Sequence, residues 1–546
     1  MSGPAILRPA TSASAITIIA ARTNFLGERL VQALRDSSAS TPVSFSTIED
    51  SPPSATDCVY LPSTRSGGFA PDLSEAQSVF EKLKQHPRKI ILISSALVYG
   101  AWPGRLAMVQ EDFTGRSKTR DSISADWRQL ESLASLNLDQ GALTILRPVT
   151  VLASQTPLGR NLLRRFVVTL PGHDPVLQLL SISDLAQAIL RVLQQNQAGI
   201  FNVAPDGVVP LHEAIRQVGS FRMPVPRTLQ RLFASSEKLD YFRYPWTVSN
   251  QRLKKVCGFV PQKSSMAALE ELSQPKRPRP DPEPRFDDFG MDHKYIVACE
   301  KILFRFLSWY YWRIEARGLE HLPRKGPAVL VGTHRGFIPW DGVMAVHLIA
   351  QTTGRVPRFL THSGLLKFPF IANFVTKLGG VPAWQENAER ILENGEILGV
   401  FPEGTRGAFA LYRDAYKLQS FGRDTFIKLA LRYRVPIIPF VTVGSAEIFP
   451  VFWQIKSPRW TRYSDWPCLP ISTFPFCPLP LPSKWHTRFL APIEVGKEYP
   501  AKAAEDSSVV KAIGLRVRNQ MQSAMDEMRA RRPSIFFGSV FGSEEE

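Results

Sequence analysis

Short runs of β-branched and aliphatic residues alternate with segments of helical period along most of this chain. In the first half, four such runs are separated by longer amphipathic stretches such as residues 27–35; they are residues 15–20, 58–61, 89–94 and 143–146. In the second half, runs at residues 328–332, 397–401 and 435–443 alternate with helical stretches at 387–394 and 425–434. Because parallel strands need a crossover between them, usually a helix, this alternation predicts α/β architecture in both halves.

The chain is long for a single hydrophobic core. Its 546 residues favour two domains. Prolines mixed with Lys, Arg and Asp at residues 274–285 cannot continue a helix or a central strand, and therefore indicate a stiff linker. We predict a Rossmann-like domain at residues 1–270, a linker at 271–292, a second α/β domain at 293–530 and a flexible tail at 531–546.

The net charge and the cysteine content limit which binding partners and which cellular compartment are expected. The formal net charge of +17 implies attraction to an acidic surface, either nucleic acid or an anionic membrane. No zinc-finger spacing or RNA-recognition signature is present, so we expect no nucleic-acid partner and favour a membrane surface. The five cysteines are scattered, which argues against a zinc site or disulfide framework and predicts no metal and a reducing compartment.

No segment is expected to span a bilayer as a helix. Residues 296–312 are apolar and aromatic but include Glu300, Lys301 and Arg305, and residues 466–483 are uncharged but contain six prolines. The first 15 residues lack the pattern of a secretion signal. We therefore expect peripheral or monotopic attachment at the cytoplasmic side of a membrane, with the aromatic stretches 294–312 and 451–485 as anchors.

Three segments in the second half carry a chemical signature. They are Gly-Thr-His-Arg-Gly-Phe-Ile-Pro-Trp-Asp-Gly from Gly332, Phe-Pro-Glu-Gly-Thr-Arg-Gly from Phe401, and Val-Pro-Ile-Ile-Pro from Val435. In this order they resemble the glycerolipid acyltransferase family typified by lysophosphatidic acid acyltransferase, over residues 294–500. The resemblance implies a glycerolipid-acyltransferase-like α/β domain, an acyl thioester donor on coenzyme A or acyl carrier protein, and no required cofactor.

The chemistry of acyl transfer suits these residues. A lipid hydroxyl is a poor nucleophile and needs a base within hydrogen-bond reach, the role we assign to His334. Asp341 would fix the imidazole tautomer and stabilise the imidazolium. The resemblance further implies that one loop binds the acceptor, through Glu403, Gly404, Thr405 and Arg406. Arg406 suits an acceptor phosphate because its guanidinium is charged and can donate two parallel hydrogen bonds.

Two features depart from the family pattern. Six residues separate His334 from Asp341, where the family usually has four, and we interpret this as a subfamily variant. The block 379–384 lacks the arginine that normally meets the acceptor phosphate, and none occurs before Arg390. Lys417 or Arg413 can supply that charge for an acceptor like lysophosphatidic acid; a neutral acceptor such as diacylglycerol is the alternative.

The first half resembles the extended short-chain dehydrogenase and nucleotide-sugar epimerase family, through residues 15–27, 90–100, 146–148, 183–186 and 199–203. The family's three-glycine phosphate loop aligns with Ala21, Asn24 and Gly27, so two glycines that admit a pyrophosphate are missing. Its catalytic Tyr-x-x-x-Lys aligns with Ile123 and Trp127. We therefore predict a degenerate Rossmann-like module and doubt that it binds NAD(P).

Three hypotheses follow. The leading one is an acyltransferase that moves a fatty acyl group from a thioester to a glycerolipid hydroxyl in lipid biosynthesis. The second is a bifunctional enzyme whose Rossmann-like half also performs NAD(P)-dependent reduction or epimerisation. The third is a non-catalytic lipid-binding scaffold in which both halves have lost their activity.

Overall fold

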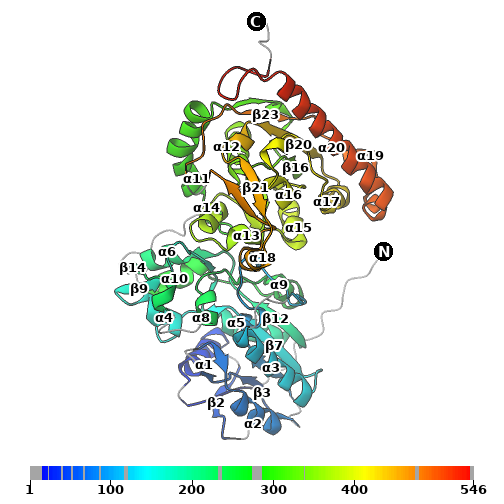
Figure 1. Cartoon of the computed structure of the whole chain (residues 1–546). Helices are drawn as coiled ribbons and strands as arrows, with labels where there is room; N and C mark the ends of the chain where they lie inside the picture. Colours follow the sequence, from blue (N-terminus) through cyan, green and yellow to red (C-terminus); the bar gives the residue numbers. More distant parts are fainter. Residues whose placement is uncertain are drawn as a thin grey trace. The chain divides into compact units, whose positions relative to one another are not determined.

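The computed structural model describes residues 15–541, apart from residues 23, 39–40, 51–52, 66–67, 85–87, 116–120, 231–235, 274–285, 337, 474–476 and 478. The chain divides into two compact units, Met1–Gly290 and Met291–Glu546 (Figure 1). The stiff linker predicted at residues 274–285 lies outside the described residues.

A six-stranded, fully parallel sheet forms the centre of the N-terminal unit. Its strand order is β12-β7-β6-β3-β1-β2; the strands are β1 (Ile16–Ala20), β2 (Val43–Thr47), β3 (Asp57–Tyr60), β6 (Ile90–Ile93), β7 (Leu143–Pro148) and β12 (Gly199–Val203). The four inner strands are buried along their whole length, as a sheet covered on both faces requires, whereas the edge strands β2 and β12 are partly exposed. The order reverses between β1 and β3, and this topological switch point makes the unit Rossmann-like.

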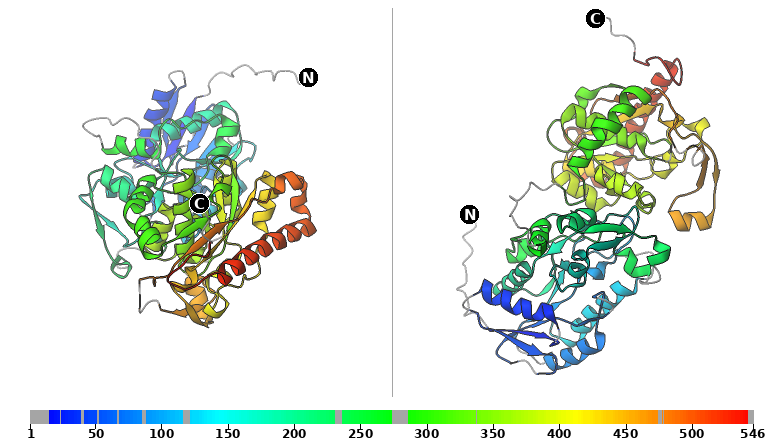
Figure 2. Two further views of the ribbon diagram at one scale, coloured as in Figure 1. Left: turned by 90° about the horizontal axis from the view of Figure 1, so that it is seen from above. Right: turned by 90° about the vertical axis from the view of Figure 1, so that its left-hand side faces the viewer.

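Helices cover both faces of this sheet (Figure 2). They are α1 (Phe25–Ser37), α2 (Leu73–Leu83), α3 (Ser122–Asn137) and α5 (Ile182–Gln194). Helix α1 packs beside α5, and α2 packs beside α3. Because parallel crossovers are right-handed, connections that run in opposite directions from the switch point place their helices on opposite faces.

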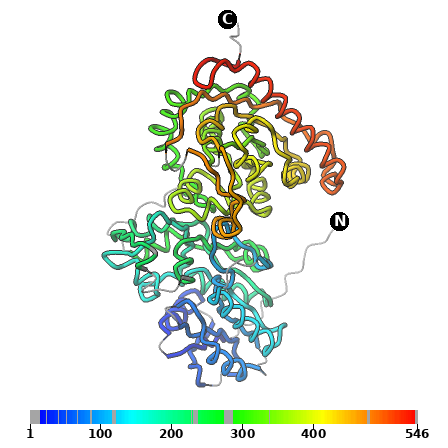
Figure 3. Tube along the Cα trace, in the orientation of Figure 1, coloured from blue at the N-terminus to red at the C-terminus, as the bar shows by residue number. Residues whose placement is uncertain are grey.

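The C-terminal unit, coloured from green to red along the chain trace of Figure 3, contains a mixed sheet. This sheet has seven strands in the order β15-β23-β20-β16-β19-β17-β18. The strands are β15 (Glu315–Arg317), β16 (Ala328–Gly332), β17 (Arg358–Thr361), β18 (Val381–Pro382), β19 (Ile397–Val400), β20 (Ile437–Val443) and β23 (His486–Phe489). Only the β20–β23 pair of this sheet is antiparallel. The main helices are α12 (Trp340–Thr353), α15 (Gln385–Glu393), α17 (Thr425–Tyr433) and α20 (Ser507–Ala530).

The C-terminal unit opens with a helical segment that has one buried and one exposed face. Helix α11 (His293–Cys299), capped by the Asp292 carboxylate, continues as π-helical turns at Glu300–Phe304 and Phe306–Tyr311. Trp312 ends it and stacks on Trp485 with ring centroids 4.4 Å apart. Within the described part of the chain, no helix has both the length and the apolar character needed to cross a bilayer.

The tail predicted to be loose from residue 531 is ordered as far as Phe541. The Lys484 N–H donates to the Ile535 carbonyl at 2.7 Å, and Arg313 donates to the Phe536 carbonyl at 2.7 Å. Val540 is only 2% exposed. Aromatic and aliphatic residues in the tail give it enough apolar surface to pack beside β23, which its terminal Gly, Ser and Glu residues did not indicate.

His486 makes the stability of this packing depend on pH. Its ring is fully buried, and burial holds its pKa below the ordinary value although Glu315 lies close by. An unfolded histidine takes up a proton near pH 6.5, whereas the folded one resists it. The free energy of unfolding should therefore fall as the pH drops below about 6.5. Urea unfolding at several pH values should show a flatter dependence for His486→Gln; an unchanged slope would contradict this assignment.

Candidate active site

The loops that follow three adjacent parallel strands meet at one edge of the C-terminal sheet. His334 comes two residues after β16, Glu403 comes three residues after β19, and Ser445 comes two residues after β20. Since β16 pairs with both β19 and β20 in parallel, their carboxyl ends lie side by side. In open α/β sheets this edge is where ligands bind.

His334 and Asp341 are brought into direct contact. The His334 Nδ1 lies 2.8 Å from Asp341 Oδ1 and 3.0 Å from Oδ2. A carboxylate can only accept, so Nδ1 carries the proton and Nε2 presents its lone pair. Among the described residues, no group hydrogen-bonds Nε2. The imidazole therefore has the tautomer and orientation that a general base requires.

The seven-residue offset between the two side chains is accommodated by the loop. Asp341 lies in the first turn of α12, and its oxygens also accept the N–H groups of Arg335 at 2.7 Å and Gly342 at 2.8 Å. Gly336 has φ of +67°, which lets the chain turn back toward His334. The Phe401 ring stacks on the imidazole with centroids 4.9 Å apart. The longer spacing is therefore compatible with an intact His–Asp contact.

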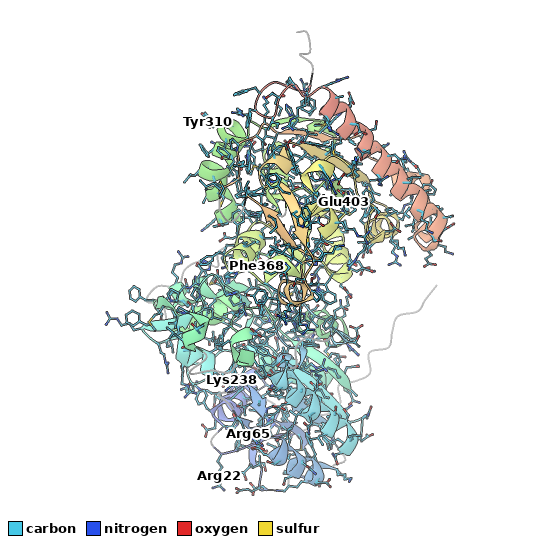
Figure 4. All side chains as sticks on the ribbon, in the orientation of Figure 1. Arg22, Arg65, Lys238, Tyr310, Phe368 and Glu403 are labelled. Carbon is cyan, nitrogen blue, oxygen red and sulfur yellow. The ribbon has the colours of Figure 1, made fainter. Side chains whose placement is uncertain are left out.

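Arg335 is a site residue that the sequence reasoning missed. Its guanidinium is 3% exposed and forms a two-pronged ion pair with Glu403, at 2.7 and 3.1 Å (Figure 4 labels Glu403). It also donates to the carbonyl of Lys417 at 3.2 Å. The pair ties the loop of His334 to the loop after β19. An arginine beside the motif histidine, together with a glutamate in the second motif, was the available signal.

The predicted acceptor-binding residues fall into two groups. Glu403 is buried, and its oxygens are occupied by Arg335 and by the Gln419 N–H at 2.6 Å, so it holds the loop and does not face a ligand. Arg406 and Lys417 are exposed. Arg406 donates to Ser420 at 3.0 Å, so the two cations lie on segments that contact each other. They form a basic surface beside the His334 loop.

The C-terminal helix and tail hold the segment that carries Lys417. Gln522 of α20 accepts from the Leu418 N–H at 2.8 Å and donates to the Tyr416 carbonyl at 3.0 Å. Glu447 accepts hydrogen bonds from Tyr416 and Arg532, and all three side chains are largely buried. Burial and the Glu447 charge raise the pKa of Tyr416, which keeps it protonated as a donor. These contacts fix the segment against which Arg335 packs.

Gly404 and Thr405 form the turn between β19 and the short helix α16 (Thr405–Ala408). Gly404 has φ of +56° and ψ of −139°, a backbone conformation that is strained for any residue with a side chain. A Cβ there would meet no atom within 4 Å, so the strain is purely conformational. Gly404→Ala should lower the free energy of unfolding by about 1–3 kcal/mol, measurable in urea. Gly422→Ala, which has no positive φ, is the control; equal losses would refute the argument.

In the N-terminal unit, a side chain of the protein bonds the backbone amides at the start of α1, where the family's phosphate loop lies. Asn24 caps α1, with its side-chain oxygen accepting the N–H groups of Leu26 at 3.1 Å and Gly27 at 3.3 Å. A dinucleotide pyrophosphate uses those same unpaired amides at the helix N-terminus. Gly27 alone keeps the family's packing role, because a Cβ would lie 3.1 Å from Phe45 and 3.2 Å from Ala20. The Asn24 side chain therefore occupies backbone amides that a bound pyrophosphate would need.

The residue that aligns with the family's catalytic lysine is a buried tryptophan. Trp127 is buried, and its indole N–H donates to the Phe69 carbonyl at 2.8 Å. Tyr99 donates to Asn202 at 2.8 Å, and burial raises its pKa to about 12. Arg147 joins this network through Tyr99 and through Glu131. These buried side chains are engaged with one another and with the backbone.

The described residues contain no cluster of three or more His, Cys, Asp or Glu side chains arranged to hold a metal ion. The cysteines they include, Cys58, Cys257, Cys299, Cys468 and Cys477, are free thiols.

Comparison with known proteins assigns the class of the C-terminal unit and then the family of the chain. A family model described as Acyltransferase matches residues 313–443, so the unit contains an acyltransferase domain. An uncharacterized protein of Mycobacterium tuberculosis is 36% identical over 262 residues, which are 46% of this chain and 72% of that protein. A protein of Mycobacterium leprae shows the same identity over 46% of this chain and 70% of its own length. The chain belongs to the family of these mycobacterial proteins.

More distant similarities are also found. A protein of Bos taurus named "DGAT1/2-independent enzyme synthesizing storage lipids" is 28% identical over 146 residues, 27% of this chain and 43% of that protein. Among solved structures, the human epimerase family protein SDR39U1 with NADPH covers 47% of this chain and 99% of its own, at 18% identity and a TM-score of 0.41. A UDP-N-acetylglucosamine 4-epimerase of Bacillus cereus covers 48% and 99%, at 14% identity and a TM-score of 0.36.

Proposed function

We propose that this protein transfers a fatty acyl group from an acyl thioester to the hydroxyl of a glycerolipid. The observation that carries the proposal is the His334–Asp341 contact inside an acyltransferase domain, with no hydrogen bond to Nε2 of the imidazole among the described residues. The donor is a fatty acyl thioester of coenzyme A or of acyl carrier protein. The pathway is lipid biosynthesis.

The reaction needs one proton to move twice. Nε2 of His334 accepts the proton of the lipid hydroxyl while the oxygen attacks the thioester carbonyl. The resulting imidazolium is stabilised by the Asp341 carboxylate, which two backbone N–H groups hold in place. When the tetrahedral intermediate collapses, the carbon–sulfur bond breaks and the imidazolium returns its proton to the thiolate. An ester and a free thiol result, and no acyl-enzyme is required.

The acceptor we favour resembles lysophosphatidic acid. Arg406 and Lys417 are exposed on contacting segments beside the His334 loop, where a phosphate would find two cations. Lys417 has only a 3.5 Å contact with Asp414, so its charge remains available. A neutral acceptor such as diacylglycerol is the second candidate, because the block 379–384 has no arginine and a bovine relative is named for synthesising storage lipids.

A membrane surface is the proposed location of the substrate. The outer face of the first helical segment exposes Ile302, Phe306, Trp309 and Tyr310, with Arg305 over the Trp309 ring at 5.5 Å (Figure 4 labels Tyr310). Phe537 of the ordered tail is 69% exposed, with Arg313 over its ring at 5.3 Å. Aromatic rings beside cations suit the headgroup region, so the unit is proposed to lie on the cytoplasmic side of a bilayer.

The acceptor is tested by offering labelled acyl-coenzyme A with lysophosphatidic acid or with diacylglycerol to the purified full chain. We expect lysophosphatidic acid to be acylated, and expect Arg406→Gln combined with Lys417→Gln to raise KM for it about tenfold or more with little effect on kcat. Arg423→Gln, another exposed arginine of this unit, serves as the control. Acylation of diacylglycerol alone would assign the neutral acceptor.

A further inference from the structure

The N-terminal unit carries a two-stranded ribbon whose outward face is apolar. Strands β9 (Phe166–Thr169) and β14 (Phe221–Pro224) pair in parallel, with Phe166 opposite Phe221 and Val168 opposite Met223. These two strands form a sheet of their own, separate from the six-stranded sheet, and lie side by side in Figure 1. We call this pair, with its flanking segments 157–165 and 225–229, the β9–β14 ribbon.

Exposed and buried side chains alternate along β9, as they do on a strand that has one face in solvent and one face in the core. Val167 is 1% exposed and packs in a core cluster with Leu162 and Leu179, while its neighbours Phe166 and Val168 are 51% and 44% exposed. On a strand with one solvated face, the outward positions are normally polar. Here both outward positions of β9 and their partners on β14 are aromatic or aliphatic.

The exposed apolar side chains are concentrated on the paired strands and the segments that flank them. Six large apolar residues of the ribbon are between 41% and 60% exposed; they are Leu163, Phe166, Val168, Phe221, Met223 and Leu229. The two phenylalanine rings lie 6.0 Å apart between centroids. A concentrated set of this kind marks an interaction surface, because isolated exposed apolar residues are common but contiguous ones are not.

The charge of the ribbon has one sign. Residues 157–169 and 221–229 contain five arginines and no Asp or Glu. Arg160, Arg164 and Arg165 are exposed, and within the described residues none of the three forms an ion pair. Arg165 lies over the Phe166 ring at 5.6 Å, which places a cation at the border of the apolar face. A partner that matches this surface therefore offers both an apolar region and negative charge.

We infer that the β9–β14 ribbon binds the surface of an anionic phospholipid membrane. Phenylalanine, leucine, valine and methionine gain free energy by entering the boundary between headgroups and acyl chains, and arginine forks match lipid phosphates. Nucleic acid would use the aromatic rings and cations but gain nothing from the exposed aliphatic side chains. The inference gives the Rossmann-like unit a role that needs no dinucleotide, and it does not depend on acyl transfer.

The test measures partitioning of the full chain onto vesicles of phosphatidylcholine, with or without phosphatidylglycerol, in the absence of an acyl donor. The background is W309S/F537S, which weakens the other proposed membrane surface. In this background we expect Phe166→Ser with Phe221→Ser to lower partitioning onto the anionic vesicles about tenfold. Arg164→Gln with Arg165→Gln should give a similar loss and a weaker salt dependence.

The matched control is Leu136→Ser with Val260→Ser, which removes two apolar residues of the same unit that lie outside the ribbon and are 82% and 61% exposed, more than Phe166 and Phe221. Its partitioning should match that of the background. An equal loss in the control, or no loss in the ribbon variants, would overturn the inference. Sedimentation velocity is the second readout: self-association that the F166S/F221S change abolishes, without vesicle binding, would assign the ribbon to a second copy of the chain and also overturn it.

Discussion

His334→Ala is expected to lower kcat for acyl transfer about 10³-fold while leaving the fold intact. In the proposed reaction His334 Nε2 receives the hydroxyl proton, and among the described residues no hydrogen bond occupies this nitrogen. Its ring stacks on Phe401 but makes no hydrogen bond besides those to Asp341 among the described residues, so its removal should cost little stability. Initial rates at saturating donor and acceptor measure the effect.

Two variants make this result interpretable. His321→Ala removes a histidine of the same unit that contacts the Phe489 carbonyl, and should change kcat less than about twofold. Asp341→Asn keeps the side-chain shape but cannot accept from His334 Nδ1 and from both backbone N–H groups as the carboxylate does, so kcat should fall about 10²-fold or more. Full activity of His334→Ala would show that another group acts as base.

Breaking the Arg335–Glu403 pair should have the largest effect on stability. Both side chains are almost wholly buried, so removing one partner strands a charge in the interior. Glu403→Gln or Arg335→Met should therefore lower the free energy of unfolding by about 3–5 kcal/mol. Urea unfolding of each variant provides the measurement.

The double variant Arg335→Met with Glu403→Met separates pairing from packing. Since two apolar side chains of similar volume leave no stranded charge, it should be more stable than the sum of the single losses predicts. Glu498→Gln disrupts the exposed pair with Arg516 and should cost less than about 1 kcal/mol. Similar losses for Glu498→Gln and Glu403→Gln would contradict the central role of burial.

Seven strands of the two main sheets, all of them fully buried, could be predicted from local sequence. The run at residues 328–332 is β16, and the runs at 58–61 and 397–401 differ from β3 and β19 by one residue at their ends. These strands are buried on both faces, so each one shows as a continuous apolar run whose composition alone identifies it. The 24-residue helix α20 was not predicted, although Asp506 provides a cap signal.

The site was predictable only where one motif contains both partners. His334 and Asp341 lie seven residues apart, and their contact follows from one loop and one helix turn. Arg335 and Glu403 are 68 residues apart, and Glu447 and Arg532 are 85 apart, so only the sheet topology brings them together. Burial of Glu403 likewise depends on packing that no local pattern records, so its ion pair with Arg335 could not be predicted from the motif.

In the N-terminal unit, helix packing and the exposure of backbone amides at the loop after β1 depend on different residues. Gly27 still allows α1 to pack closely on β1, whereas Asn24 now satisfies the amides that a pyrophosphate would use. The fold depends on packing, and the ligand site depends on unpaired donors. The two can therefore change separately, and the unit is free to serve another surface such as the β9–β14 ribbon.

The central claim is tested most directly by incubating the purified full chain with labelled acyl-coenzyme A and lysophosphatidic acid on vesicles, and following ester and free thiol together. The account predicts that both form in equal amounts with the wild type and that neither forms above background with His334→Ala. If the folded wild type yields no ester with acyl-coenzyme A or acyl carrier protein, on this acceptor or on diacylglycerol, the protein is a lipid-binding scaffold and the proposed reaction is wrong.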